Sequence, residues 1–371
     1  MSKVLHYLQN IIGWHTSRHI VVFESDDWGS IRMPSKAVYN ELLSSGINVD
    51  RCLFSRYDSL ETEDDLLQLF NVLKSVKDSK GHSAIFTANS VVANPDFEAI
   101  EASGFQEYSY EAVASTYLKY DGCKDSLETV LQGINDGVWM PQLHGREHLN
   151  VIRWMNALRV NDEMTRLCFS QHHFSLTKAA SPKVKARYMD AFGNVGDDSL
   201  RIESNIIREA AALFEQIYGF KSKSFIAPCY IWRLELEQVL KEAGVEYLQG
   251  LPIQQIPVSA DPLQCKSRFH YLGQRNSSGQ RYLVRNAFFE PYKGGSSNGV
   301  EDCLERISIA FKCHKPAIVS THRLNYIGTL DKDYRDKNLD KLQLLLTKIV
   351  QRWPDVEFLS SNQLGDIIAN G

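Results

Sequence analysis

Two short segments of this sequence could hold one metal ion between them. The first contains the adjacent carboxylates Asp26 and Asp27, and the second contains His144 and His148, four positions apart. Histidines at this spacing on one helical turn reach the same cation, and a carboxylate from elsewhere completes a three-ligand site with a position open for water. Water on such an ion is activated for hydrolysis. The two segments therefore predict a metal-dependent hydrolase.

The two adjacent carboxylates are expected to have different roles. They follow an apolar run, 19–23, that is typical of a strand. Successive side chains of a strand point in opposite directions, and like charges repel. One carboxylate could therefore bind the metal ion while the other accepts a proton. Taken alone, the same residues also fit a solvated acidic turn that caps a helix.

Three further polar residues stand at the ends of apolar runs. His322 ends the run 317–321, and an ordinary pKa of about 6.5 lets a histidine donate a proton to a leaving amine near neutral pH. Arg285 and Glu290 lie where another predicted strand runs out. We expect them at the rim of the same site, where they could orient the carboxylate or the substrate.

The run 224–228 ends in a proline that two aromatic residues follow. An N–H group after Pro228 could hold an oxyanion, and Tyr230 or Trp232 could stack on the face of a sugar. A purely structural role for these aromatic residues at a strand end fits the pattern equally well.

The second segment also matches the pattern His-x-x-Glu-His of the inverted zinc proteases. Such a protease needs the pattern within a stable helix and a downstream glutamate as third ligand, for which Glu209 and Glu215 are the convenient candidates. Gly145 and the strand just upstream argue against a helix there. This alternative also leaves Asp26 and Asp27 without a function.

The elements that carry these residues alternate between strands and helices along the whole chain. Seven or eight such units without a dividing linker predict an α/β fold, a distorted (β/α) barrel of the TIM type in one domain, 1–371. The motifs fall in 19–326, and 327–371 would add a closing helix, strand and helix. An open, doubly wound sheet is the alternative. The weakly patterned stretches 171–198 and 254–279 are expected to be long loops around the carboxyl-end mouth. The predicted strands are 19–25, 83–88, 138–143, 224–228, 246–249, 281–286, 317–321 and 356–360, and the predicted helices are 64–76, 126–134, 151–168, 203–218, 234–243, 299–311 and 338–353.

The composition argues against several classes of protein. The 371 residues include 41 Lys and Arg against 45 Asp and Glu, so no field of one sign would attract nucleic acid. The 7 cysteines are scattered, which argues against a disulfide framework or a thiolate zinc site. No apolar run reaches the roughly 20 residues that span a bilayer, and the first motif lies too early for a removable signal peptide. We expect a cytoplasmic protein without stable membrane insertion, and no pattern indicates an oligomeric state.

The first residues form a short apolar face at helical spacing. We expect this face to pack against the core, because the segment leads straight into the first strand. Contact with a membrane surface is the alternative. The residues of the face are Val4, Leu5, Leu8, Ile11 and Ile12.

In this order, the motifs resemble those of the polysaccharide deacetylase superfamily, which includes chitooligosaccharide and peptidoglycan deacetylases. The first segment is similar to the family's Thr-Phe-Asp-Asp, the second to its His-x-x-x-His, and His322 to its final catalytic histidine. The resemblance implies a barrel with one divalent metal ion, usually zinc, with cobalt or nickel as alternatives. By motif position it implies Asp27, His144 and His148 as ligands, Asp26 as general base and His322 as general acid.

The chain departs from this family at two motifs. The family's Arg-x-Pro-Tyr is replaced by a segment around Pro228 that has no arginine, and Arg285 could substitute from a neighbouring strand. No acidic-aromatic motif is recognisable as support for His322.

The reaction that the resemblance implies is removal of an acyl group, most simply N-acetyl, from a carbohydrate or sugar conjugate. Because the chain carries no recognisable export signal, we expect a small or precursor sugar, nucleotide-linked or lipid-linked, rather than a wall polymer. One alternative is a cytosolic amide hydrolase that acts on a ureide-like small molecule. Another is a catalytically inactive carbohydrate-binding relative.

Overall fold

The computed structural model describes residues 3–180, 187–260, 263–291 and 299–371. Its centre is a nine-stranded sheet with the order β10-β7-β6-β5-β2-β1-β12-β11, in which β13 also pairs with β1. Every pairing within this sheet is parallel. The strands are β1 (Ile20–Trp28), β2 (Phe86–Ser90), β5 (Trp139–Leu143), β6 (Ser224–Phe225), β7 (Tyr247–Gly250), β10 (Arg281–Val284), β11 (Ala287–Phe288), β12 (Ala317–His322) and β13 (Glu357–Phe358).

The two ends of this sheet are consecutive pieces of chain. Only Arg285 and Asn286 separate β10 from β11. The N–H of Arg285 donates to the carbonyl of Gly250 at 2.9 Å, whereas the N–H of Asn286 donates to that of Ile318 at 3.1 Å. One stretch of chain therefore pairs first with β7 and then with β12, and the sheet curls round on itself. This confirms the predicted α/β barrel.

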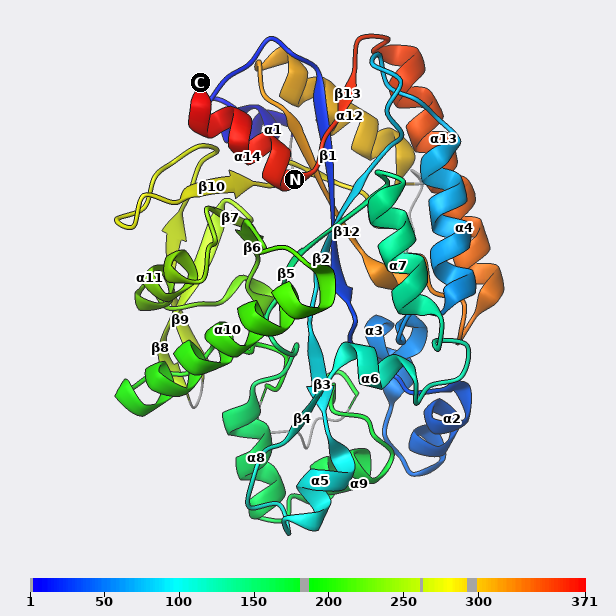
Figure 1. Cartoon of the computed structure of the whole chain (residues 1–371), viewed down its shortest axis with the longest axis vertical. Coiled ribbons are helices and arrows are strands. Elements are labelled where there is room, and N and C mark those ends of the chain that lie inside the picture. Colours follow the sequence, from blue (N-terminus) through cyan, green and yellow to red (C-terminus); the bar gives the residue numbers. More distant parts are fainter. Residues whose placement is uncertain (1–2, 181–186, 261–262, 292–298) are drawn as a thin grey trace.

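Helices cover the outside of the sheet and one of its ends (Figure 1). Helices α4, α7 and α13 lie on one side of the central strands, and α10 and α11 lie on the other. Smaller helices gather beyond the carboxyl ends of the first strands. The helices are α1 (Lys3–Gln9), α2 (Lys36–Ser44), α3 (Leu53–Tyr57), α4 (Glu63–Lys74), α5 (Phe97–Ala102), α6 (Val113–Tyr117), α7 (Ser126–Asn135), α8 (Val151–Arg159), α9 (Glu163–Ser170), α10 (Asp197–Tyr218), α11 (Glu235–Glu242), α12 (Val300–Lys312), α13 (Lys332–Arg352) and α14 (Ser361–Asn370).

Alternation along β1 decides which of its side chains enter the barrel. Val21 and Phe23 pack in the cluster that includes the apolar faces of α4, α12 and α13. Ile20 and Val22 instead join a second cluster with residues of β7, β10, β12 and α14. Because side chains alternate along a strand, Glu24 lies on the same side of β1 as Ile20 and Val22, nearer the carboxyl end. This side of β1 is thus apolar at its amino end and acidic at its carboxyl end.

Three details of the predicted elements were wrong. The helix predicted over 151–168 is two helices, because Asn161 adopts a left-handed φ of 57° and Asp162 caps α9. The helix predicted over 203–218 begins earlier, at Asp197, so Ser204 lies within α10, where its hydroxyl donates to the Leu200 carbonyl at 2.6 Å. The predicted loop 254–279 contains an antiparallel hairpin, β8 (Ile253–Ala260) and β9 (Leu263–Phe269).

The apolar face at the start of the chain was predicted to pack against the core. This prediction was wrong, because the residues of the face are exposed. Val4 is 66% exposed and Ile11 is 57% exposed, and Leu5, Leu8 and Ile12 are similar. The face of α1 that packs inward carries His6, and Asn10 just beyond the helix is also buried. Among the described residues, no helix is both long enough and apolar enough to cross a membrane.

Candidate metal and acid-base site

The carboxyl end of β1 turns both adjacent carboxylates into one cavity. Asp26 pairs in register with His322 of β12. The pairing with β2 then shifts between Ser25 and Trp28, and Asp27 adopts a left-handed φ of 80°. This break in the regular strand brings Asp27 to the same cavity as Asp26. Both carboxylates therefore line one cavity despite the alternation of the strand, and their immediate partners differ.

Asp27, His144 and His148 form a cluster of three potential metal ligands. Their ligand atoms lie within 4.8 Å of one another, and all three side chains are buried. The Oδ1 atom of Asp27 is 3.4 Å from Nε2 of His144 and 3.2 Å from Nε2 of His148. No helix holds the two histidines, because the segment between β5 and α8 is a loop in which Gly145 has a φ of 108°.

The protonation of these residues fits a divalent cation. Nδ1 of His144 donates to the Ile226 carbonyl at 2.9 Å, which leaves the buried Nε2 atom, without a hydrogen-bond partner, free to bind an ion. Burial and the charge of Arg32 lower the pKa of His148 well below 6.5. Burial opposes ionisation of Asp27, but Arg32 and His148 lower its pKa well below the usual value. Neutral imidazole and ionised carboxylate are the forms that bind metal.

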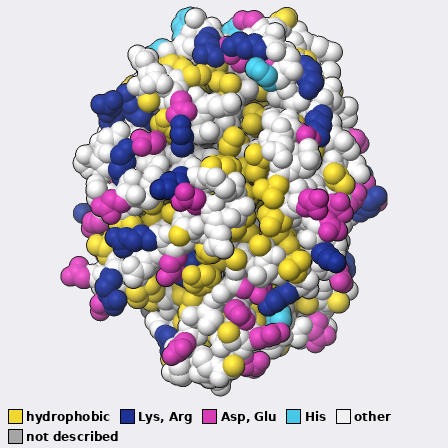
Figure 2. Space-filling model, in the orientation of Figure 1, with side chains coloured by type: hydrophobic (Ala, Val, Ile, Leu, Met, Phe, Trp, Pro, Cys, Tyr) yellow, Lys and Arg dark blue, Asp and Glu magenta, His cyan; other side chains and the backbone are white. Residues whose placement is uncertain are grey.

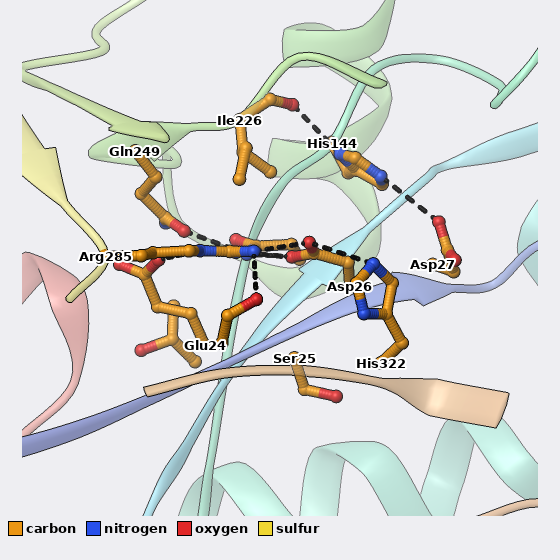
Figure 3. Close-up of polar contacts among 12 residues, drawn as sticks. Glu24, Ser25, Asp26, Asp27, His144, Ile226, Gln249, Arg285 and His322 are labelled. Carbon is orange, nitrogen blue, oxygen red and sulfur yellow. Dashed lines mark hydrogen bonds and ion pairs between the residues drawn. The ribbon is translucent and has the colours of Figure 1, made fainter. Parts of the chain in front are cut away.

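Asp26 is held by Arg285, which lies at the junction of β10 and β11. Nη1 and Nη2 of Arg285 donate to Oδ2 and Oδ1 of Asp26 at 2.7 and 2.6 Å, and Nε donates to Glu24 at 2.6 Å (Figure 3). Burial would raise the pKa of Asp26, but the ion pair with Arg285 lowers it below its ordinary value. Glu24 has the opposite balance, because burial raises its pKa despite the same arginine.

His322 stands between Asp26 and a second carboxylate. Its Nδ1 atom lies 2.5 Å from Oε1 of Glu290, and its Nε2 atom lies 3.8 Å from Oδ2 of Asp26. Burial alone would lower the pKa of His322, but the charge of Glu290 and its hydrogen bond raise it to about 9. The imidazole is therefore protonated at neutral pH and can donate from Nε2.

A cavity of about 240 Å³ connects these groups. It is lined by both aspartates, by His144, His148 and His322, and by Tyr230 among others. The Tyr230 hydroxyl accepts a hydrogen bond from Arg285 at 3.1 Å. Trp232 is not brought to this cavity, because its ring is 3% exposed in an apolar cluster and its Nε1 donates to Glu237 at 3.3 Å.

The geometry does not support the protease alternative. The histidine pair is not helical, and both oxygens of Glu147 accept hydrogen bonds from Arg146 at 2.6 and 2.8 Å. Arg146 also pairs with Glu209. Glu215 is exposed and lies 4.0 Å from Lys221. None of these glutamates joins the ligand cluster found among the described residues.

Several side chains at the site had no signal in the sequence. Asn89 of β2 donates to Asp26 at 2.7 Å and to Gln249 of β7 at 2.8 Å. Arg32 lies 3.1 Å from the Asp27 carboxylate. These residues stand on loops or at strand positions without a recognisable pattern, so only barrel closure reveals them. His172 and His173 lie outside the ligand cluster found among the described residues.

Comparisons with known proteins found similar solved structures at low sequence identity. No protein-family model and no curated protein matches the chain. Similar solved structures include a protein from Mycobacterium smegmatis assigned to the polysaccharide deacetylases, with 10% identity, coverage of 97% of this chain and 93% of that one, and a TM-score of 0.49. A protein from Parabacteroides distasonis assigned as a glycoside hydrolase/deacetylase has 9% identity, coverage of 95% and 72%, and a TM-score of 0.49. Puue allantoinase has 11% identity, coverage of 95% and 91%, and a TM-score of 0.47.

All three similar structures have TM-scores below 0.5. Identities of about one in ten concern the fold alone.

Proposed function

We propose that this protein is a metal-dependent hydrolase that removes an acyl group, most simply N-acetyl, from a carbohydrate. The observation that carries the proposal is the meeting of three groups in one cavity: the ligand cluster of Asp27, His144 and His148, the ionised Asp26, and the protonated His322. A site for an ion, a base and an acid around one small space is what amide hydrolysis requires.

Each group has a distinct task in this proposal. A divalent ion on Asp27, His144 and His148 would polarise the acyl oxygen and activate water. Asp26, kept ionised and oriented by Arg285, would accept the proton of that water. His322 would then donate its Nε2 proton to the departing nitrogen.

The backbone after Pro228 supplies a candidate donor for the developing oxyanion. Cys229 and Tyr230 both adopt left-handed φ values, 57° and 58°, which is unusual for side chains of this kind. The N–H of Tyr230 already donates to the Ala227 carbonyl at 3.0 Å. We therefore assign the N–H of Cys229 rather than that of Tyr230 to this task.

The test is release of acetate from N-acetylated sugars by the purified chain loaded with zinc, cobalt or nickel. The matched control is Asp26→Asn, which should keep its metal and lose turnover. Equal acetate release by the parent and by Asp26→Asn at full metal occupancy would overturn the assignment of the base. The absence of release from a metal-loaded parent across a panel of N-acetyl sugars would overturn the deacetylase function.

A small amide of the ureide type is the second candidate substrate. The cavity of about 240 Å³ lies below the 300–1,000 Å³ of ordinary ligand pockets. It has room for one sugar unit or a small amide. Consumption of ureides without acetate release from any sugar would favour this second candidate.

A further inference from the structure

Arg32 is a buried cation in the wall of the cavity that holds the ligand cluster, and the proposed reaction does not use this arginine. The residue follows β1, adopts a left-handed φ of 53°, and is 4% exposed. Its guanidinium lies 5.1 Å from the centre of the Phe54 ring, and that ring lies 5.6 Å from the ring of His322. Arg32 and His322 therefore flank the same aromatic side chain at the cavity.

The partners of Arg32 do not satisfy its hydrogen-bonding capacity. A guanidinium has five N–H donors, and a buried one is costly unless they are used. Within the described ranges its contacts are ion pairs, 3.1 Å to Oδ1 of Asp27 and 3.5 Å to Oδ2 of Asp58, and the buried Nε makes no hydrogen bond. Asp58 is itself shared, because Arg323 donates to its other oxygen at 2.9 Å.

Asp27, the nearer partner, is also a proposed metal ligand. A metal ion bound to Asp27 would compensate the negative charge of that carboxylate. Asp27 would then neutralise less of the positive charge of Arg32. The guanidinium would then face the cavity with Asp58 as its remaining anionic neighbour among the described residues. A cation placed beside a cation site suits a ligand that brings negative charge of its own.

A second cavity adjoins the first, and its described charged residues are basic. Its volume is about 430 Å³, and Thr177 and Met189 line both cavities. Lys178 and Arg187 are in its wall, whereas no acidic residue lines it among the described residues. The acidic groups in the wall of the first cavity are Asp26 and Asp27 alone, again within the described part of the chain. Over the face in view in Figure 2, basic and acidic side chains are interspersed.

We propose that the substrate is an anionic acyl sugar, whose carboxylate or phosphate group is bound by Arg32, with Lys178 and Arg187 attracting it along the second cavity. This inference rests on the proposed deacylase function and narrows its substrate. Because Arg32 and the ligand cluster share a cavity of about 240 Å³, the anionic group belongs to the same sugar unit as the acyl group. Arginine suits either anion, since its planar fork matches carboxylate and phosphate alike.

The experiment compares three substrates with the zinc-loaded parent and its variants. The substrates are N-acetylglucosamine, N-acetylglucosamine 1-phosphate and N-acetylmuramic acid, which carry no anionic group, a phosphate and a carboxylate. We expect kcat/KM to be at least tenfold higher for one anionic sugar, and which one it is identifies the anion. Arg32→Gln should abolish that preference, with a loss of kcat/KM at least tenfold larger on the anionic sugar than on the neutral one, and Arg32→Lys should restore part of it.

Two further variants separate recognition from folding. Lys178→Ala/Arg187→Ala, at exposed positions, should raise KM for the anionic sugar and weaken its dependence on salt concentration. Arg201→Gln on α10, whose side chain is 71% exposed, is the matched control and should change neither. Equal kcat/KM for neutral and anionic sugars in the parent would overturn the proposal. So would an equal loss on both kinds of sugar in Arg32→Gln.

Binding distinguishes a failure of this inference from a failure of the proposed function. Calorimetric titration of Asp26→Asn with the same three sugars requires no turnover. Arg32-dependent binding of an anionic sugar without acetate release by the parent would support the anion site and reject the deacetylase. Turnover of neutral and anionic sugars at equal rates would support the deacetylase and reject the anion site.

Discussion

Arg285 donates hydrogen bonds to both carboxylate oxygens of Asp26, at 2.6 and 2.7 Å, although the two residues are 259 positions apart in the chain. The two residues meet because Arg285 lies at the junction of β10 and β11, where the curled sheet returns to β1 through β12. The segment around Pro228 carries no arginine, and Arg285 contacts Asp26 from a different part of the sheet. Such bidentate pairs fix orientation as well as charge.

Replacing Arg285 should therefore damage both the base and the fold. Arg285→Gln leaves two buried carboxylates without their counter-ion, at a cost of about 3–5 kcal/mol of unfolding free energy. The pKa of Asp26 should rise, so the acidic limb of the pH-activity profile should move to higher pH, and kcat should fall on the order of 10²-fold. Urea unfolding and a pH profile measure both effects.

Arg285→Lys is the conservative comparison for that variant. It keeps the charge but loses the fork, so it should recover stability more than kcat. In the parent, the lowered pKa of Asp26 stabilises the fold at pH values above 3.8, the pKa of this group in the unfolded chain. That contribution disappears as pH falls through the pKa of the folded state. An unmoved acidic limb in Arg285→Gln would contradict the proposed role of the pair.

Metal content should depend on three residues and not on the neighbouring base. Asp27→Ala and His148→Ala should reduce bound zinc, cobalt or nickel from about one ion per chain to near none, because a three-ligand site does not survive with two. Asp26→Asn should keep the ion. Elemental analysis after dialysis measures the content.

A matched control for the metal experiment is His172→Ala, since this histidine is exposed and stacks on Phe97 instead of facing the cavity. It should retain the ion in full. An ion at 100 times its dissociation constant should also stabilise the parent by about 2.7 kcal/mol, and not the Asp27→Ala variant. Metal retained by both ligand variants would show that the cluster does not bind it.

The alkaline limb of activity should report His322. Its folded pKa of about 9 exceeds the ordinary 6.5, so the acid form is lost, and activity with it, as pH rises through about 9. The same difference stabilises the fold fully below pH 6.5, and this contribution is lost as pH rises through the folded pKa. NMR titration of the imidazole, together with a pH-rate profile, measures both.

Glu290→Gln tests the cause of that raised pKa. The amide removes the negative charge while keeping a hydrogen-bond acceptor beside Nδ1 of His322. The alkaline limb should therefore move to lower pH, and activity at pH 8 should fall more than activity at pH 6. A limb that stays in place would assign it to a group other than His322.

Packing between α4 and α7 should make Gly133 intolerant of a side chain. A Cβ there would lie 2.5 Å from the ring of Phe70 and 3.2 Å from the Cβ of Trp139. Alanine normally stabilises a helix relative to glycine by about 1 kcal/mol, but overpacking costs about 1–3 kcal/mol. Gly133→Ala should therefore lower Tm while activity per folded molecule is unchanged, whereas Gln132→Ala, exposed on the same helix, should leave Tm nearly unaltered. A rise in Tm for Gly133→Ala would show that Phe70 moves aside freely.

Much of the fold could be predicted because it depends on local pattern. All eight predicted strands are present, with shifts of a few residues at their ends. Short β-branched runs indicate strands, and the stretches of helical periodicity between them indicate helices. Each element can therefore be predicted from its own residues. The hairpin β8/β9 was missed because its strands carry proline and polar residues, and its pairing depends on contacts between two weakly patterned segments.

The sequence by itself determined which segments carry Asp26, Asp27, His144, His148 and His322, because each follows an apolar run and strand ends of a parallel barrel face one mouth. Only the tertiary structure decided their partners. Arg285 reaches Asp26, Glu290 reaches His322, and Arg32 enters the cavity, because closure of the sheet sets which strands are neighbours and in which register. A side chain's neighbours inside a barrel come from distant parts of the chain, so no local pattern encodes them.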